Sequence, residues 1–278
     1  MFRGLLLAAA LAVGLVAAPA HARVSTHNPK AVTDPAGDSN GAPDITRVTV
    51  ANSLAGEILF VVQVSNRNEL AANDGVAIVI DSDQNAATGD RNGDGGVDYV
   101  ILISGTQRTI GLLRWNGTTY ERAPDTTLEG EWNSGYVVVI NRSELGNTSK
   151  FDYFVDTFLE SGAENQSDSA PNDVWEEYAL GTPHVQSLAL RWSPTAPRAG
   201  RAFRLTAVQL RFESDETAAA ASFTCRATLG GKRLRGTGRG GCTFRLPASA
   251  KGKRLVVTIT ATPAGGQAVS RAVTFRVR

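Results

Sequence analysis

Apolar residues in the first two thirds of this chain form short runs rich in Val, Ile, Phe and Tyr, each followed by Asn, Gly, Asp or Pro. Such runs predict β-strands. Apolar side chains alternate within 57–65, which indicates a strand with one covered face, whereas the continuous run 76–80 predicts a central strand covered on both faces. We expect strands at 45–50, 57–65, 76–80, 97–103, 109–115, 136–140, 151–158 and 174–180. Helix is limited to one or two turns near 68–72 and 143–145.

The last third of the chain alternates more strictly, with a period of two. One face of the strand at 222–229 contains Phe223, Cys225, Ala227 and Leu229. Further strands are expected at 185–192, 202–212, 242–246, 255–259 and 273–277. About seven strands in some 95 residues match the size of an immunoglobulin-like sandwich. The predicted fold class is therefore all-β, with two β-sandwich domains.

The first residues have the pattern of a secretory signal peptide. Arg3 precedes the apolar stretch 4–18, and Ala20-His21-Ala22 has the small residues of a cleavage site. The apolar stretch is shorter than the roughly 20 residues that cross a bilayer. We therefore expect residues 1–22 to be removed from an exported, extracellular protein that has no membrane span.

Charge divides the rest of the chain into two halves. Residues 23–183 carry 24 Asp and Glu against 10 Lys and Arg, a balance of −14. Residues 184–278 carry 3 against 17, a balance of +14. We expect an acidic domain at 23–183, a basic domain at 184–278 and a linker at 181–184. Opposite charges of this size predict that the domains attract each other, or that the basic domain binds an anionic surface.

Both cysteines of the chain, Cys225 and Cys242, lie in the basic half. Export would place them in an oxidising compartment, where such a pair is expected to form a disulfide. Closing a loop of this length stabilises a fold by about 3 kcal/mol in the chain-entropy model. Two buried free thiols are the alternative.

The stretch 81–98 concentrates five carboxylates, three side-chain amides and four glycines between two apolar runs. Calcium takes about six to eight oxygen ligands, and glycines let the chain curl around it. From Asp90 the sequence matches part of an EF-hand loop, but Ile101 occupies the twelfth position, where the pattern has glutamate. We expect calcium in a strand-flanked loop; a solvated acidic loop is the alternative. The candidate ligands are Asp81, Asp83, Asp90, Asn92, Asp94 and Asp98.

Several motifs of the acidic half resemble those of exported bacterial modules. These motifs are Asp34-Pro-Ala-Gly-Asp38, Pro43-Asp44-Ile45, Ile80-Asp81-Ser-Asp83, Thr88-Gly89 and Val97-Asp98-Tyr99. Over residues 31–181 the chain is similar to β-sandwich modules related to family 9 carbohydrate-binding modules and the DOMON-like group. The resemblance implies a non-catalytic, jelly-roll or carbohydrate-binding-module-like domain; several such modules contain structural calcium, and some bind sugars. For the second domain, the resemblance is to the immunoglobulin-like architecture only.

Aromatic residues near the turn at 116–117 are the candidate sugar-binding residues, because an aromatic face suits the apolar side of a pyranose ring. The first candidates are Trp115, Tyr120 and Trp132, with Tyr136 and Trp175 as further ones. Tryptophan in a sandwich also packs in the core or at its rim, which is the alternative.

A second cation site is a further candidate in the acidic half. Its residues would be Asp34, Asp38 and Asp44, together with Asp168, Asn172 and Asp173. Asp and Asn beside Gly and Pro are also ordinary turn residues, which is the alternative.

The segment 232–239 places four positive charges in a Gly-rich hairpin. This suits an anionic cell-envelope polymer or the acidic domain, and a solvated hairpin is the alternative. Aromatic residues are not interleaved with these charges, so we expect no nucleic-acid partner.

Residues suited to catalysis are few. Beyond residue 22 only His27 and His184 remain, so neither a Ser-His-Asp arrangement nor a histidine zinc site is expected. We expect a secreted, non-catalytic, calcium-stabilised protein that recognises carbohydrate or a cell-envelope polymer. A structural or adhesive surface protein is the second class, and a secreted hydrolase that uses two carboxylates is the third.

Overall fold

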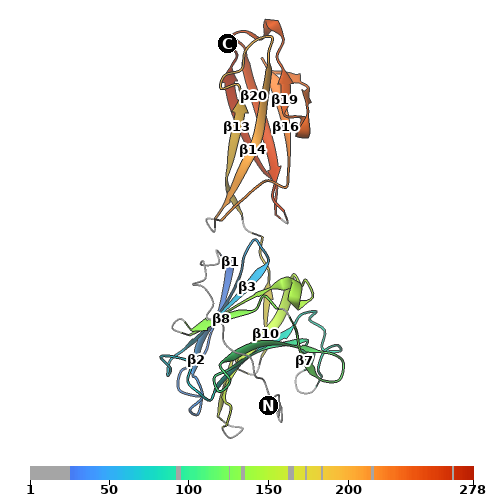
Figure 1. The fold of residues 1–278 in the computed structure, drawn as a ribbon. Helices are drawn as coiled ribbons and strands as arrows, with labels where there is room; N and C mark the ends of the chain where they lie inside the picture. The colour runs from blue at the N-terminus through green and yellow to red at the C-terminus, as the bar shows by residue number, and fades with distance from the viewer. Residues whose placement is uncertain are drawn as a thin grey trace. The chain divides into compact units, whose positions relative to one another are not determined.

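The computed structural model describes residues 26–91, 95–124, 126–132, 135–161, 166–172, 174–182, 184–213, 216–264 and 266–278. The regular secondary structure of the described chain is almost entirely β-strand, with a few short 3-10 helices (Figure 1), which confirms the all-β prediction. It divides into two compact units, one ending at Gly181 and one spanning Thr182–Arg278. This division falls two residues before the boundary expected from charge. The predicted signal peptide at 1–22 lies outside the described residues.

The acidic unit contains two antiparallel sheets. Sheet I has the order β1-β2-β3-β9-β8, and sheet II has the order β11-β10-β4-β5-β6-β7, with β12 also paired to β10. The strands of sheet I are β1 (His27–Thr33), β2 (Ile45–Asn52), β3 (Glu57–Val64), β8 (Glu129–Trp132) and β9 (Tyr136–Asn141). Those of sheet II are β4 (Asp74–Asp81), β5 (Tyr99–Ser104), β6 (Thr109–Trp115), β7 (Tyr120–Arg122), β10 (Lys150–Leu159), β11 (Ser167–Ala170) and β12 (Glu176–Ala179).

One apolar core lies between the two sheets, because alternate side chains of each strand point to the same face. Phe60 and Val62 of β3 belong to it, as do Ile78 and Ile80 of β4, and all four are fully buried. These contacts between the sheets make the unit a β-sandwich.

Strand β4 is covered on both faces, as its continuous apolar sequence predicts. On the outer face of sheet II, Val79 belongs to a smaller cluster that includes Val97, Leu113 and Phe154. Val97 lies in the long connection between β4 and β5. This connection therefore covers part of the outer face of sheet II.

Most strands predicted for this unit are present, with ends shifted by a few residues. The turn expected near 143–145 is the 3-10 helix η1 (Arg142–Leu145), where the Asn141 side chain accepts a hydrogen bond from the Ser143 N–H. The helical turn expected at 68–72 is wrong, because these residues form bends and irregular backbone that lead into a turn. Strands β1, β7, β8 and β11 were not predicted.

The basic unit also contains two antiparallel sheets. Sheet III has the order β13-β14-β19-β18, with β15 paired to β14, and sheet IV has the order β17-β16-β20-β21. The strands of sheet III are β13 (Val185–Ser193), β14 (Ala202–Phe212), β15 (Thr217–Ala218), β18 (Gly236–Thr237) and β19 (Thr243–Arg245). Those of sheet IV are β16 (Ser222–Leu229), β17 (Lys232–Leu234), β20 (Arg254–Thr262) and β21 (Val269–Arg276). Two 3-10 helices, η2 (Arg239–Gly241) and η3 (Ala248–Ala250), lie in the connections around β19.

The core of the basic unit joins sheets III and IV. Phe203 and Leu205 of β14 pack in one buried cluster with Leu229 of β16 and with Leu255 and Val257 of β20. The inner rows expected from the period-two pattern are therefore present. The unit is a second β-sandwich, of immunoglobulin-like size.

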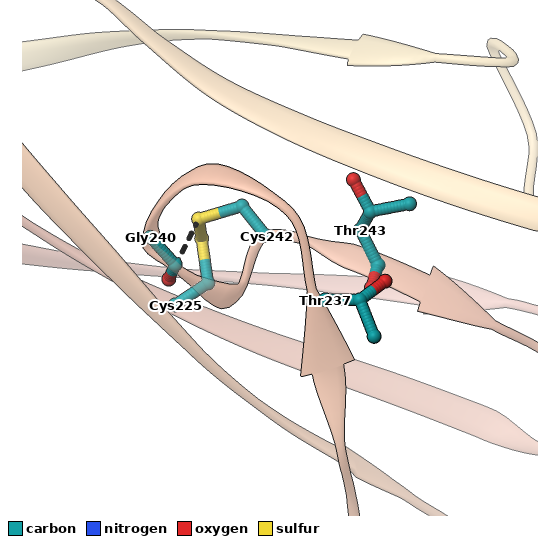
Figure 2. Close-up of a disulfide and its surroundings, with 5 residues drawn as sticks. All are labelled: Cys225, Thr237, Gly240, Cys242 and Thr243. Atoms are coloured by element: carbon teal, nitrogen blue, oxygen red, sulfur yellow. Dashed lines mark hydrogen bonds between the residues drawn. A yellow bond between two sulfur atoms is a disulfide. The ribbon is translucent and has the colours of Figure 1, made fainter.

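Cys225 and Cys242 form the expected disulfide (Figure 2). Cys225 lies on β16 and Cys242 immediately precedes β19, so the bond joins sheet IV to sheet III; the two Cα atoms are 4.9 Å apart. Cys242 is buried and Cys225 packs against the core cluster, so both face inward as predicted. Between them, Gly240 has a φ of +66°, and a Cβ there would lie 2.1 Å from the Phe223 carbonyl oxygen. Only glycine fits this close approach.

Candidate metal centre

The two ends of the acidic connection between β4 and β5 lie side by side at one end of the strands of sheet II. β4 ends at Asp81, and the Asp98 N–H, just before β5, donates a hydrogen bond of 3.0 Å to the Ile80 carbonyl. Carboxylate oxygens of Asp81, Asp83 and Asp98 all lie within 4.8 Å of one another. Three of the six ligands predicted from the sequence thus converge.

Hydrogen bonds hold these three carboxylates in place. Asp81 Oδ1 accepts from the backbone N–H groups of Asp83 and Asn85, both at 3.3 Å. Asp98 Oδ2 accepts from the Ser82 N–H at 3.0 Å and from the Ser82 hydroxyl at 2.7 Å. The Thr88 hydroxyl donates to both oxygens of Asp83, at 3.0 and 2.9 Å. The loop therefore orients the cluster through its own backbone and hydroxyl groups.

No basic side chain of the described residues balances the charge in the cluster. In the part of the chain that the structure describes, none of the three carboxylates forms an ion pair with Lys or Arg. Burial raises the pKa of Asp81 to about 6, and the Asp83 and Asp98 carboxyls add to the rise, although backbone N–H donors oppose it. Two ionised carboxylates at about 5 Å repel by about 3 kcal/mol at an effective dielectric constant of about 20. A hard dication would replace this repulsion by attraction.

The other predicted ligands have different outcomes. Asp90 is buried, its backbone pairs with Val97, and its carboxyl accepts a hydrogen bond from the Tyr120 hydroxyl. Asp90 is not one of the three converging residues and instead ties the loop to the β6–β7 hairpin. Asn92 and Asp94 lie outside the described residues.

A row of polar side chains that the sequence pattern did not predict lies beside the candidate metal centre. Asp81 is the register partner of Asp152 on β10, which in turn pairs with Glu177 on β12. Gln84 reaches from the loop to both, and its amide donates to Asp152 at 2.7 Å and to Glu177 at 2.8 Å. Only the strand register brings these residues together, so local spacing contains no signal for them.

The aromatic candidates do not form one platform. Trp115 and Tyr120 face each other across the β6–β7 hairpin, with ring centroids 5.1 Å apart, and both are half-buried. Trp132 is on β8 in sheet I, where it packs against the buried Tyr136 with centroids 4.9 Å apart. Trp175 packs against Phe154 on the outer face of sheet II. The structure therefore brings together Trp115 and Tyr120, but not Trp132.

A second acidic cluster lies at the other end of sheet II. Carboxylate oxygens of Asp34, Asp38 and Asp168 lie within 4.8 Å of one another. Burial, and then the neighbouring carboxylates, raise the pKa of Asp34 to about 7, and burial raises that of Asp168 to about 6. The Asn172 side chain donates to Asp34 Oδ1 at 3.2 Å.

Asp44 has a different role from the one expected in that second site. Although burial opposes its ionisation, hydrogen bonds from the Ser65 hydroxyl and the Gly37 N–H lower its pKa. Both of its oxygens are thus used in turns, while Asp173 lies outside the described residues. Of the residues predicted for a second cation, Asp34, Asp38 and Asp168 converge.

The two histidines of the described chain have different surroundings. The His27 ring contacts the Gly181 carbonyl at 2.8 Å and the Asn52 amide at 3.0 Å, and His184 is exposed. No helix of the described residues is long and apolar enough to cross a membrane.

Comparisons with known proteins add little. No protein-family model matches the chain, including any for carbohydrate-binding modules, and no curated protein matches it. Among solved structures, murine CEACAM1b is 10% identical, with 81% of this chain and 94% of that chain covered and a TM-score of 0.24. The amphioxus IgVJ-C2 molecule is 14% identical, with 80% and 97% covered and a TM-score of 0.26. Cadherin domains 3-6 of protocadherin gamma B2 are 10% identical, with 90% and 50% covered and a TM-score of 0.24. TM-scores of this size establish neither a common fold nor a common function.

Proposed function

We propose that this chain is an exported, non-catalytic binding protein that recognises carbohydrate or a cell-envelope polymer and whose acidic domain is stabilised by calcium. The observation that supports calcium most directly is the convergence of Asp81, Asp83 and Asp98 without a basic partner among the described residues. Carboxylate oxygens are the ligands that calcium prefers, and backbone carbonyls or water would complete its shell.

Calcium at this place would act on the fold. The loop that supplies Asp83 also supplies Val97 to the apolar cluster on the outer face of sheet II, and Asp90 of the same loop is bonded to Tyr120. Fixing the loop therefore keeps the outer face of the central strand covered. We assign the ion a structural role.

Melting with and without calcium tests the metal. Calcium sites in extracellular modules have a Kd of about 0.1 to 1 mM, so about 1 mM calcium adds up to about 1.4 kcal/mol, or about 3 to 6 °C in the Tm of a domain of this size. Asp98→Asn should lose this shift. Glu69→Gln, which removes the same charge at an exposed position of the same domain, should keep it.

Binding to a glycan array tests recognition. We expect signals for a subset of glycans that persist in repeated preparations of the calcium-loaded protein. Trp115→Ala, which removes one ring of the Trp115–Tyr120 pair, then reports whether that aromatic takes part. An array without signal for any neutral or charged glycan would leave the spacer or adhesive class as the better account.

A further inference from the structure

Sheet IV of the basic unit has an outer face rich in arginine and hydroxyl groups. Successive residues of a strand point to opposite faces, so the outward side chains of β16 are those between the core residues Cys225, Ala227 and Leu229. Most outward positions of β16, β20 and β21 are Ser or Thr. The outward basic residues are Arg226, Arg233, Arg254 and Arg276, and all four are exposed.

Negative charge is missing from this sheet altogether. From Thr217 to Arg278 the sequence contains no Asp or Glu, and all four strands of sheet IV fall in that range. None of the four outward arginines forms an ion pair in the part of the chain that the structure describes. Soluble proteins usually intersperse both signs of charge on their surfaces. Sheet IV therefore supplies no counter-charge of its own for this face.

The face is hollowed between β17, β16 and β20. Arg226, Thr228, Arg233, Val256 and Thr258 line a hollow of about 390 Å³. This volume is within the range of small-ligand sites, about 300 to 1,000 Å³. Arginine binds carboxylate, sulfate and phosphate through paired N–H groups, and threonine hydroxyls both donate to and accept from sugar hydroxyls.

The chemistry of the face disfavours nucleic acid and protein as its partners. Single-stranded nucleic acid is held by aromatic side chains that stack on bases, and no outward residue of sheet IV is aromatic. Protein interfaces depend on large apolar or aromatic anchors. The exposed large hydrophobic residues of the described chain, Val174 and Val208, both lie outside this sheet.

We infer that the outer face of sheet IV binds a linear polysaccharide carrying carboxylate, sulfate or phosphate groups, with Arg226 and Arg233 holding one anionic group in the hollow. The four arginines would contact successive charges of the polymer, and the hydroxyl rows would bond its sugar hydroxyls. This inference rests on the proposed recognition of an envelope polymer and names both its surface and its chemistry.

Binding of the two-domain protein to heparin, a linear sulfated polysaccharide, tests the inference. Arg226→Ser with Arg233→Ser should weaken the affinity about tenfold or more and reduce its dependence on salt. The matched control is Arg204→Ser with Arg245→Ser, which removes the same charge from exposed positions of sheet III and should change the affinity about twofold or less. Polygalacturonate should bind through the same residues, and neutral dextran should not bind.

Several results would overturn the inference. An equal loss of heparin affinity in the two double variants would show that heparin is attracted by net charge alone. Tighter binding of oligothymidine through the same residues would make nucleic acid the ligand, and arginine-dependent self-association without heparin binding would make the partner a second copy. Measuring the Tm of the protein with and without calcium separates the two proposals. A calcium-dependent rise in Tm without heparin binding rejects only the polysaccharide site. Heparin binding without a rise in Tm rejects only the calcium site.

Discussion

Several carboxyls of the acidic unit are partly or fully buried and lie close to other carboxyls, and burial first, then mutual repulsion, raises the free energy of their ionised forms. Asp156 on β10 shows the effect outside the proposed metal centre. Burial, and then the neighbouring Asp168, raise its pKa to about 6, although the Ser169 hydroxyl donates a hydrogen bond of 2.6 Å that favours the ionised form. Burial therefore disfavours the ionised form of Asp156 by more than the hydrogen bond from Ser169 favours it.

We expect Asp156→Asn to remove part of the pH dependence of stability. Because the folded pKa of about 6 exceeds the ordinary value of 3.8, the folded state holds the proton more tightly. The Asp156 carboxyl therefore adds at most about 3 kcal/mol to the free energy of unfolding. This contribution is full below about pH 4 and is lost as the pH rises through about 6. Urea unfolding from about pH 4.5 to 7.5 measures this, and the profile of the variant should be flatter. A profile parallel to that of the unsubstituted protein would contradict the assignment.

Local spacing predicted only part of each acidic site. Asp81, Asp83 and Asp98 were predictable because the two strand ends that carry them are neighbours in the β4–β5 hairpin. Asp90 is not among the converging residues, and its hydrogen bond with Tyr120 of a different hairpin could not be read from local spacing. Asp168, which was among the predicted residues of the second site, lies on β11 beside β10 and converges with Asp34 and Asp38.

At the scale of strands, the apolar ones were predicted and the polar ones were missed. Strand β1 has five exposed residues among its seven, and β8 has three among its four. Both lie at the edges of sheet I, where backbone pairing to one neighbour is enough to fix a strand. The order of the strands could not be predicted either, because it depends on pairing between segments that are distant in the sequence, such as β4 and β10.

Reduction of the disulfide should destabilise one domain only. The bond closes a loop with a sequence separation of 17 between two sheets, so its loss should lower the free energy of unfolding of the basic domain by about 3 kcal/mol. The acidic domain contains no cysteine, and its own unfolding transition serves as the internal control. Unfolding with and without a reductant measures the effect, and mass spectrometry verifies the gain of two hydrogens. An unchanged basic transition after complete reduction would contradict the stabilising role.

At the scale of the whole molecule, opposite charges are joined by a short linker. Residues 23–183 have a balance of −14 and residues 184–278 one of +14. We expect a linker of about four residues at 181–184 to limit the separation of the domains to about one or two Debye lengths at moderate salt. We therefore expect the domains to attract each other in the absence of a polyanion.

Small-angle scattering tests this attraction. The radius of gyration should rise from low salt to about 0.5 M salt as screening loosens the domains. A polyanion that occupies sheet IV should raise the radius at low salt as well. A radius that does not change with salt would reject the attraction and leave the basic domain free for an anionic partner.

Calorimetric titration of calcium into metal-free protein tests the central claim most directly. We predict saturable binding with a Kd of about 0.1 to 1 mM that is lost in Asp98→Asn and retained in Glu69→Gln. No heat of binding together with no shift in Tm, or equal binding by Asp98→Asn and the unsubstituted protein, would contradict calcium at Asp81, Asp83 and Asp98.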